Sequence, residues 1–187
     1  PTAAGWGLFL EECSAAEHWV LADYGWFDPE KSSSRVVFGD LTRLLQDLVV
    51  KLGGSSKETE WFGEMVEVEE QTQQVIEEIV GSGETLSEGS LVRTVVSGLP
   101  EGALLATGNS LAIRDLDIFC KGSSSSASVW SQRGASGIDG LVAGAAGAAS
   151  VFQGATTLLI GDVSFLHDLS GTCCLREITS PLAVVII

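Results

Sequence analysis

The segment from residue 156 to residue 171, TTLLIGDVSFLHDLSG, ends an apolar run with a glycine and a carboxylate. Asp162 follows the run directly, at the end of an expected buried strand. An unpaired carboxylate is costly in such a place, and a magnesium ion, which takes a few carboxylate or carbonyl oxygens together with phosphate oxygens, would pair with it. Asp162 is therefore a candidate metal ligand. The alternative is that it caps the helix that follows.

Two further polar residues follow in the same segment. Asp168 lies near a predicted helix start, which favours a capping role over a role in chemistry. His167 is interpreted as a surface or hydrogen-bonded histidine rather than a ligand, because a lone histidine carries no metal-binding spacing.

The segment RGASGIDG, residues 133–140, could bind an anion. Gly134 and Gly137 permit tight turns and close approach of the backbone, and the N-terminus of the helix that follows offers free N–H groups and the positive end of a dipole. Arg133 and Ser136 would add a positive charge and a hydroxyl. An equally weighted alternative is a glycine-eased turn between a strand and a helix.

Ser110 and Arg114 are spaced by one helical turn, which places them on the same helix face. Behind a strand end, a hydroxyl and a guanidinium at this spacing could jointly hold a carboxylate. The alternative is a helix cap followed by a surface charge pattern in the letters RDLD.

The elements that must position these residues alternate between strands and helices from residue 85 onward. A capping box of Thr85 and Glu88 would begin a helix that runs to Val96. Apolar runs predict strands at 103–107, 129–131, 157–160 and 182–187, and helical patterns are predicted at 110–119, 138–149 and 169–178. This order is typical of an α/β domain with a doubly wound parallel sheet. Ligands bind beyond the carboxyl ends of such strands, and the three polar segments follow three of these ends.

The preceding part of the chain divides into two regions. Residues 1–54 predict strands at 18–22 and 35–38 and a helix from Leu41, capped by Asp40 and stopped at Gly53-Gly54, as in the tail of a second α/β domain. Residues 55–84 predict an acidic helical connector whose apolar stripe packs on neighbouring elements. Residues 85–187 form the remaining domain.

Composition excludes several function classes. With 10 Lys and Arg against 25 Asp and Glu, the formal charge of −15 argues against nucleic acid and anionic membranes as partners. It suits a protein whose acidic face docks on a basic partner. No apolar run approaches the roughly 18 residues of a membrane span, and no signal peptide is visible. The chain begins with Pro1 rather than Met, so we expect that a preceding segment was removed or is not included.

Other motifs are missing from the sequence. The four cysteines lack zinc-like spacing and are expected to be reduced thiols that pack as small hydrophobic residues. A GxSxG nucleophile motif and the phosphate-binding GxxxxGK[ST] motif do not occur.

Together, GNSLAIRDLD, RGASGIDGL and GDVSFLHDLSG resemble the thiamine-diphosphate-dependent 2-succinyl-5-enolpyruvyl-6-hydroxy-3-cyclohexene-1-carboxylate (SEPHCHC) synthases, the MenD family of menaquinone and phylloquinone biosynthesis. The resemblance is strong over residues 103–187 and weaker over 14–50, where EHWVLADYGWFDPEKSSSRVV is similar to the end of the family's middle domain. It implies that residues 85–187 are part of a diphosphate-binding domain.

The resemblance also implies an activity and a set of site residues. The family decarboxylates 2-oxoglutarate on thiamine diphosphate and adds the resulting acyl anion equivalent to isochorismate. Asp162 would be a Mg²⁺ ligand below the cofactor diphosphate. The implied substrate contacts are Ser110, Arg114 and Arg133, and the implied cofactor contacts are Gly134, Ser136, Gly137, Gly161 and Ser164. No catalytic residue of the family falls in this chain.

Departures from the family pattern leave two hypotheses. The family has Asn at the positions of Gln132 and Ser170, and Cys173-Cys174 replace small and apolar residues. The chain also stops before the family's last metal-ligand motif and lacks the pyrimidine-binding domain. The first hypothesis is part of a synthase that is completed by the remainder of the same enzyme or by a second copy.

The second hypothesis is an inactive, synthase-like relic that serves as a structural subunit of a larger complex. The letters FLHD and the serine loop resemble plant or algal forms, which implies a plastid location, with a photosynthetic complex as one home for such a relic; the alternative is a cytoplasmic location.

Overall fold

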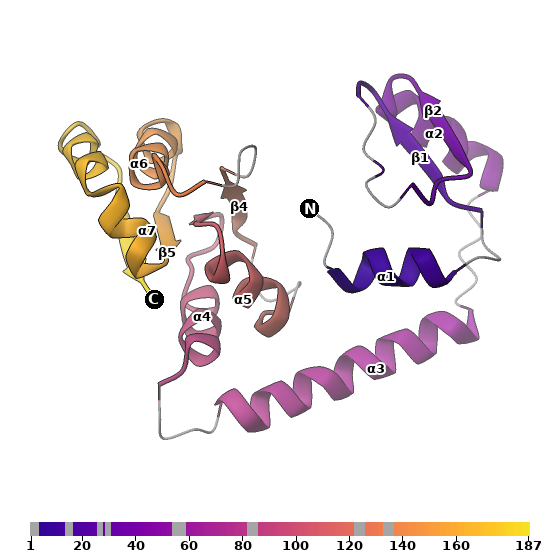
Figure 1. Ribbon diagram of the computed structural model, residues 1–187, viewed down its shortest axis with the longest axis horizontal. Helices are drawn as coiled ribbons and strands as arrows, with labels where there is room; N and C mark the ends of the chain where they lie inside the picture. The colour runs from indigo at the N-terminus through magenta and orange to yellow at the C-terminus, as the bar shows by residue number, and fades with distance from the viewer. Residues whose placement is uncertain are drawn as a thin grey trace. The chain divides into compact units, whose positions relative to one another are not determined.

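The computed structural model describes residues 4–13, 17–25, 28, 31–53, 59–81, 86–121, 126–132 and 137–187. The chain divides into two compact units, which we call unit 1 (residues 1–63) and unit 2 (residues 64–187) (Figure 1). The domain boundaries expected at residues 54 and 84 remain predictions.

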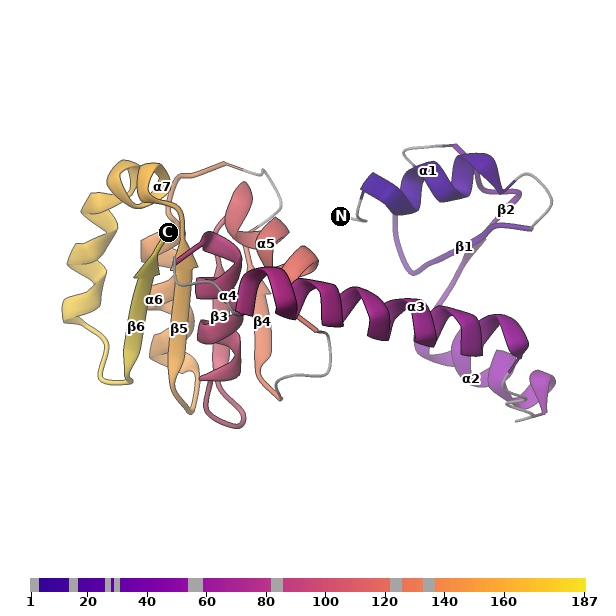
Figure 2. The ribbon, with the colours of Figure 1, turned by 90° about the horizontal axis from the view of Figure 1, so that it is seen from below.

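Unit 2 contains a four-stranded sheet in the order β4-β3-β5-β6, in which every neighbouring pair is parallel. The strands are β3 (Leu104–Thr107), β4 (Ser128–Ser131), β5 (Thr156–Ile160) and β6 (Leu182–Ile186), and they lie side by side in Figure 2. Four of the strand predictions are therefore confirmed, to within one or two residues. The fold class, an α/β domain with a parallel sheet, is confirmed as well.

Helices cover both faces of this sheet. Helix α4 (Glu88–Ser97) packs against α5 (Leu111–Phe119), and α6 (Leu141–Val151) packs against the 3₁₀ helix η2 (Leu169–Arg176), which follows the short helix α7 (Asp162–His167). The two helical layers lie on opposite sides of the sheet in Figure 2. Such double coverage explains why the central strands β3 and β5 are almost entirely buried, whereas the edge strand β4 is not.

The core of unit 2 has two parts, one on each face of the sheet. Successive strand residues point to opposite faces, so Leu158 and Ile160 pack with residues of α6, whereas Leu159 packs with residues of α4 and α5. The two clusters are Ala106, Leu141, Val142, Ala145, Leu158 and Ile160 on one face, and Val92, Val96, Leu105, Ala112 and Leu159 on the other.

Unit 1 contains helix α1 (Ala4–Glu12), two parallel strands β1 (Trp19–Ala22) and β2 (Arg35–Phe38), and helix α2 (Leu41–Leu52). Asp40 caps α2 by accepting a hydrogen bond from the backbone N–H of Arg43, and Gly53 ends the helix in the left-handed conformation. Both strands and α2 confirm the sequence predictions, whereas α1 was not predicted.

The acidic connector is helical, as predicted. It forms α3 (Glu60–Ile76) and the π-helical turn η1 (Glu77–Gly81). Arg93 of α4 ties this end of the connector to unit 2, because its guanidinium donates to Gln73 Oε1, to Glu77 Oε2 and to the carbonyl oxygen of Phe119. The expectation that the apolar stripe packs is wrong in part, since Trp61 and Phe62 are 63% and 50% exposed, whereas Ile76 and Val80 are half-buried.

Several helix boundaries differ from the predictions. The capping box of α4 is formed by Ser87 and Ser90 rather than by Thr85 and Glu88, and Thr85 lies outside the described residues. Helix α7 was not predicted, and the helix expected at 169–178 is the 3₁₀ helix η2. Helix α6 begins at Leu141 rather than at residue 138.

The expectation for the cysteines is wrong in part. Cys173 and Cys174 are exposed, so these two do not pack as small hydrophobic residues. Cys120 is half-buried beside the α4–α5 cluster, and this burial raises the pKa of its thiol. No helix in the described part of the chain has the length and apolar character needed to cross a membrane.

Candidate functional site

The strand order of unit 2 creates a crevice at the carboxyl edge of its sheet. The chain leaves β3 toward β4 on one side and then returns to β5 on the other side of β3. The loops that follow β3 and β5 therefore diverge, and ligands of open α/β sheets bind in the crevice at such a switch point. The candidate site is thus the edge where Gly108 and Gly161 leave these two strands.

At Gly108, the loop that follows β3 lies directly against the end of β5. Its N–H donates to the carbonyl oxygen of Leu159 at 2.7 Å. A Cβ atom at position 108 would lie 3.3 Å from Ile160 Cγ1 and 3.4 Å from the Leu159 carbonyl oxygen. Glycine here lets the β3 loop lie against the end of β5.

Ser110 has a strained backbone beside this crevice. Its φ of 67° and ψ of −122° lie in a region that residues with a Cβ rarely adopt, and its hydroxyl makes no capping bond to α5. Such a conformation costs on the order of 1–3 kcal/mol and persists where the surroundings impose it. The alternative interpretation of Ser110 as a side-chain helix cap is therefore wrong, and its exposed hydroxyl remains available.

Arg114 lies one helical turn after Ser110 on α5. It is exposed, and its guanidinium has no hydrogen bond or ion pair within the described part of the chain. A free hydroxyl and a free guanidinium at this spacing can hold a carboxylate by charge-assisted hydrogen bonds.

Asp115 does not belong to a surface charge pattern, contrary to one of the interpretations of RDLD. The residue is 6% exposed, and its Oδ2 atom has no hydrogen-bond partner. Burial, with a smaller contribution from the negative charge of Glu88, raises the pKa of the Asp115 carboxyl. Its side chain is therefore turned into the domain, away from the solvent that Arg114 faces.

Asp162 begins α7 at the carboxyl end of β5. The residue is exposed, so the prediction of a buried, unpaired carboxylate is wrong. The cost of burying a charge therefore gives no argument for a metal ion at this position. Its N–H donates to the carbonyl oxygen of Ile187 at 2.9 Å, and its Oδ1 accepts from the neighbouring N–H of Val163 at 2.6 Å. The carboxylate thus lies at the border of the crevice and accepts a hydrogen bond from only one N–H of the first turn of α7.

Gly161 leaves open space beside Asp162. Its φ of −70° and ψ of 152° suit any residue. A Cβ atom there would come no closer than 4.0 Å to the Ile187 carbonyl oxygen and to Ser164 Oγ. The described chain itself does not require glycine at this position. Ser164, a predicted cofactor contact, is 6% exposed in α7.

The carboxylate of Asp168 occupies the start of α6, where the sequence predicts that an anion could bind. Its Oδ2 accepts hydrogen bonds from the N–H groups of Val142 at 2.6 Å and Ala143 at 3.1 Å. The N-cap residue of α6 is Gly140, which has no side chain to do this. The carboxylate that occupies this helix end belongs to the chain itself, so these N–H groups are not free for a ligand.

His167 is a surface residue, as interpreted from the sequence. Its Nδ1 lies 3.5 Å from Asp139 Oδ1, and both side chains are at least half exposed. The contact links the loop before α6 with the end of α7.

The segment between β4 and α6 is described only at its ends. Arg133, Gly134 and Ser136 lie outside the described residues, so their predicted roles remain predictions. Gly137 is described, and its carbonyl oxygen accepts a hydrogen bond from the side chain of Asn109. Sequence reasoning missed Asn109; its place after a strand end, in the letters TGNS, was the available signal.

A metal site built from many charged ligands is not present in the described residues. No group of three or more His, Cys, Asp or Glu side chains there could hold a metal ion. Asp162 could serve only as one carboxylate among ligands of other kinds.

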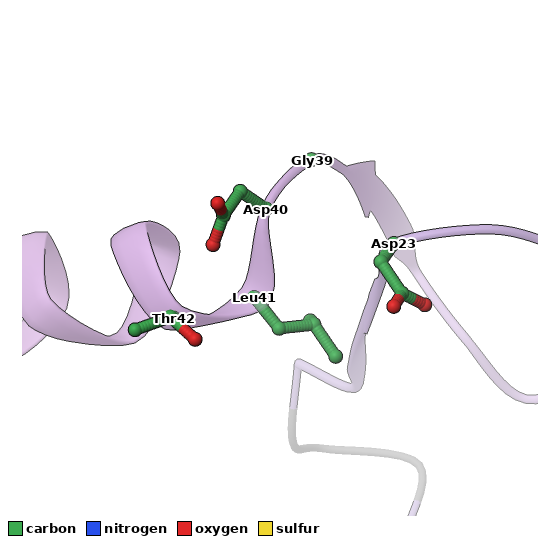
Figure 3. Close-up of a pocket in the computed structure, with 5 residues that line it drawn as sticks. All are labelled: Asp23, Gly39, Asp40, Leu41 and Thr42. Atoms are coloured by element: carbon green, nitrogen blue, oxygen red, sulfur yellow. The ribbon is translucent and has the colours of Figure 1, made fainter.

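Unit 1 has an open hollow at the carboxyl ends of its own two strands, lined by Asp23, Gly39, Asp40, Leu41 and Thr42 (Figure 3). Asp40 Oδ1 accepts from the Arg43 N–H, and Asp23 Oδ1 accepts from the N–H of Tyr24. Both carboxylates serve their own turns, so the hollow offers less for chemistry than the crevice of unit 2.

Comparison with known proteins gives a consistent result. The chain is 36% identical over its whole length to the SEPHCHC synthase of Sorangium cellulosum, of which it covers 32%. It is 32% identical over 96% of its length to the synthase of the same name from Bacillus velezensis, and 32% identical over 87% of its length to that of Listeria innocua, of which it covers 31% and 28%. No protein-family model matches the chain.

The chain spans about a third of the length of the curated relatives that it matches. Its similarity extends through both units, from the two-stranded sheet of unit 1 to β6 of unit 2. By this similarity, the chain belongs to the 2-succinyl-5-enolpyruvyl-6-hydroxy-3-cyclohexene-1-carboxylate synthase family.

Proposed function

We propose that the chain forms part of a thiamine-diphosphate- and Mg²⁺-dependent SEPHCHC synthase, which joins decarboxylated 2-oxoglutarate to isochorismate in menaquinone or phylloquinone biosynthesis. The observation that carries this proposal is the crevice between β3 and β5, where the free Ser110 hydroxyl and Arg114 guanidinium and the exposed Asp162 carboxylate all follow the carboxyl ends of adjacent strands. The rest of the active site would come from the remainder of the enzyme or from a second copy.

The donor set at the crevice fits a magnesium diphosphate group. Mg²⁺ is usually held by one or two carboxylates together with phosphate oxygens and water rather than by a cage of protein ligands. Asp162 supplies one such carboxylate. Gly161 leaves beside it the space that a Cβ atom would fill, which suits the close approach of a diphosphate to the backbone.

The residues of this chain would bind and orient. Asp162 would hold the metal ion, and Ser110 with Arg114 would hold a carboxylate of 2-oxoglutarate or isochorismate, both of which are anionic. Thiamine diphosphate, when bound, supplies the carbon nucleophile for decarboxylation and carbon–carbon bond formation. The backbone conformation of Ser110 sets where its side chain leaves the chain before the substrate binds, which lowers the cost of ordering it.

Binding of the cofactor by the protein at its native length tests this proposal. Asp162→Asn should weaken thiamine diphosphate binding in the presence of Mg²⁺ by about tenfold or more, because it removes the charged metal ligand. Isothermal titration calorimetry measures this affinity without relying on turnover. Asp117→Asn is the matched control, because Asp117 is an exposed carboxylate on α5 that has no proposed role.

An unchanged affinity in Asp162→Asn would overturn the metal role of this residue. A native protein with no affinity for thiamine diphosphate would overturn the proposed function as a whole and would favour the inactive relic. An equal loss in Asp117→Asn would mean that any lost negative charge weakens binding, which also contradicts the proposal.

A further inference from the structure

Asn109 makes two hydrogen bonds to residues that are remote in the sequence, and neither bond belongs to a helix or a strand. The residue follows Gly108 in the loop after β3 and is only 4% exposed. Its Nδ2 donates to the carbonyl oxygen of Gln132 at 3.3 Å and to that of Gly137 at 2.5 Å. The two N–H groups of one side-chain amide thus reach the residues on both sides of segment 133–136.

These bonds close the base of the loop between β4 and α6. Because a single nitrogen donates to both carbonyl oxygens, Gln132 and Gly137 are held close together at the carboxyl end of β4. In the described part of the chain, no backbone hydrogen bond joins Gln132 to Gly137. The Asn109 amide is therefore the link that fixes the two ends of this loop to each other and to β3.

The hydrogen bonds of the side chain indicate that Asn109 contributes through its Nδ2 donors and not through its Oδ1 acceptor. Asn109 Oδ1 has no hydrogen-bond partner, although it is buried. A buried acceptor without a partner costs on the order of 1–3 kcal/mol. An apolar side chain would avoid this cost but would leave the carbonyl oxygens of Gln132 and Gly137 without their donor.

Asn109 also immediately precedes Ser110, whose strained backbone needs support from its surroundings. On the other side, the Gly108 N–H is bonded to β5 through Leu159. The two bonded residues 108 and 109 thus anchor the chain directly before the strained position.

We propose that Asn109 is a positioning residue: its bonds to Gln132 and Gly137 hold the loop after β3 in place and so keep Ser110 in the backbone conformation from which it contacts a substrate. This inference rests on the proposed function, because Ser110 is a proposed substrate contact. Asn109 acts through the backbone of Gln132 and Gly137 and through the conformation of Ser110, and it does not itself bind the substrate.

The variant Asn109→Asp tests this in the protein at its native length, because it keeps the shape of the side chain and removes both donors. The KM for 2-oxoglutarate should rise by about tenfold, since a small misplacement of binding groups is costly. The affinity for thiamine diphosphate with Mg²⁺ should fall less than the KM rises, because Asp162 and Gly161 follow β5 and keep their own contacts, and Gly137 is the one expected cofactor contact that loses a hydrogen bond. Hydrogen–deuterium exchange should accelerate in the peptide that covers 131–140 and not in α4.

Thr156→Val is the matched control. Thr156 is 1% exposed, its Oγ1 also lacks a hydrogen-bond partner, and it lies at the start of β5, at the opposite end of the sheet. This variant changes a buried polar group in the same domain and should alter neither the KM nor the exchange of 131–140. A second variant, Asn109→Ser, cannot reach both carbonyl oxygens and should reproduce the effects of Asn109→Asp.

Unchanged exchange of 131–140 in a folded Asn109 variant would overturn the inference. So would equal acceleration in α4, or loss of folding in both Asn109 variants while Thr156→Val folds, because each indicates general support of the core. If the wild-type protein does not bind thiamine diphosphate, the proposed function fails, whereas the exchange comparison still decides whether Asn109 holds the loop.

Discussion

Unit 1 and unit 2 are both built from parallel strands and helices, but among the residues that the structure describes only those of unit 2 form a hydrophobic core. All four residues of β3 are buried, whereas neither β1 nor β2 has a buried residue and α2 has none either. The apolar repeat of α2 is as regular as that of any helix in unit 2. The comparison shows that short-range patterns suffice to define a helix or a strand, while burial needs further layers on the apolar faces.

The largest expected effect comes from truncating one leucine in each unit. Leu159 is 0% exposed in β5, so Leu159→Ala should destabilise unit 2 by about 2–5 kcal/mol through lost burial and a cavity. Leu48 of α2 is 44% exposed, and Leu48→Ala should cost unit 1 less than about 1 kcal/mol. Urea-dependent hydrogen exchange, read separately in β5 and α2, measures both values. Equal losses would show that α2 is buried in the native protein by a partner that this chain lacks.

A smaller effect separates a long-range helix cap from a local one. Asp168 caps α6 from a distant position in the sequence, and Asp168→Ala would leave the buried N–H of Val142 and the half-buried N–H of Ala143 without an acceptor, at a cost of about 1–3 kcal/mol. Asp40 caps α2 locally and in an exposed position, so Asp40→Ala should cost about 1 kcal/mol.

Amide exchange of the first turns of α6 and α2 checks these values, and Asp168→Asn is a control that keeps an acceptor oxygen. A smaller cost for Asp168→Ala than for Asp40→Ala would contradict the role assigned to the buried carboxylate.

The same contrast explains what could be predicted from the sequence. The start of α2 was predicted correctly because its cap, Asp40, lies next to the apolar repeat that it serves. The start of α6 was misplaced because its cap is Asp168, which no local pattern connects with Leu141. The central strands β3 and β5 were predictable from their apolar runs, since burial on both faces leaves no polar alternation.

Some features of the candidate site could likewise be predicted from the sequence, and others could not. The edge of the sheet that carries it followed from the order of strands and helices alone. The environments of individual carboxylates did not, because they depend on tertiary contacts: Asp162 was expected to be buried and is exposed, whereas Asp115 was counted as a surface charge and is buried. The place of Asn109 after a strand end was visible in the sequence, but its hydrogen-bond partners were not, because Gln132 and Gly137 are remote from it along the chain.

The smallest expected effect is a difference in pH dependence between two aspartates, one in each unit. Burial raises the pKa of the Asp115 carboxyl, whereas the hydroxyl of Ser33, with the N–H groups of Ser33 and Ser32, lowers the pKa of the Asp28 carboxyl in unit 1. An Asp whose pKa is raised by folding destabilises the folded state when it is ionised. This loss of stability develops as the pH rises from the unfolded pKa of about 3.9 through the folded pKa. Asp28 has the opposite sign, because its contribution is present above the unfolded pKa and is lost as the pH falls through the lower folded pKa.

Asp115→Asn should therefore stabilise unit 2 at neutral pH, by about 1 kcal/mol, and the gain should vanish in acid, where the wild-type carboxyl is already neutral. Asp28→Asn should destabilise unit 1 at neutral pH and should have no effect once Asp28 is protonated. Urea midpoints measured for each unit at a series of pH values, from neutral into acid well below the unfolded pKa of about 3.9, separate the two signs. Parallel profiles for the two variants would mean that both carboxylates titrate in the same environment, which is incompatible with a buried core in unit 2 and a solvated turn in unit 1.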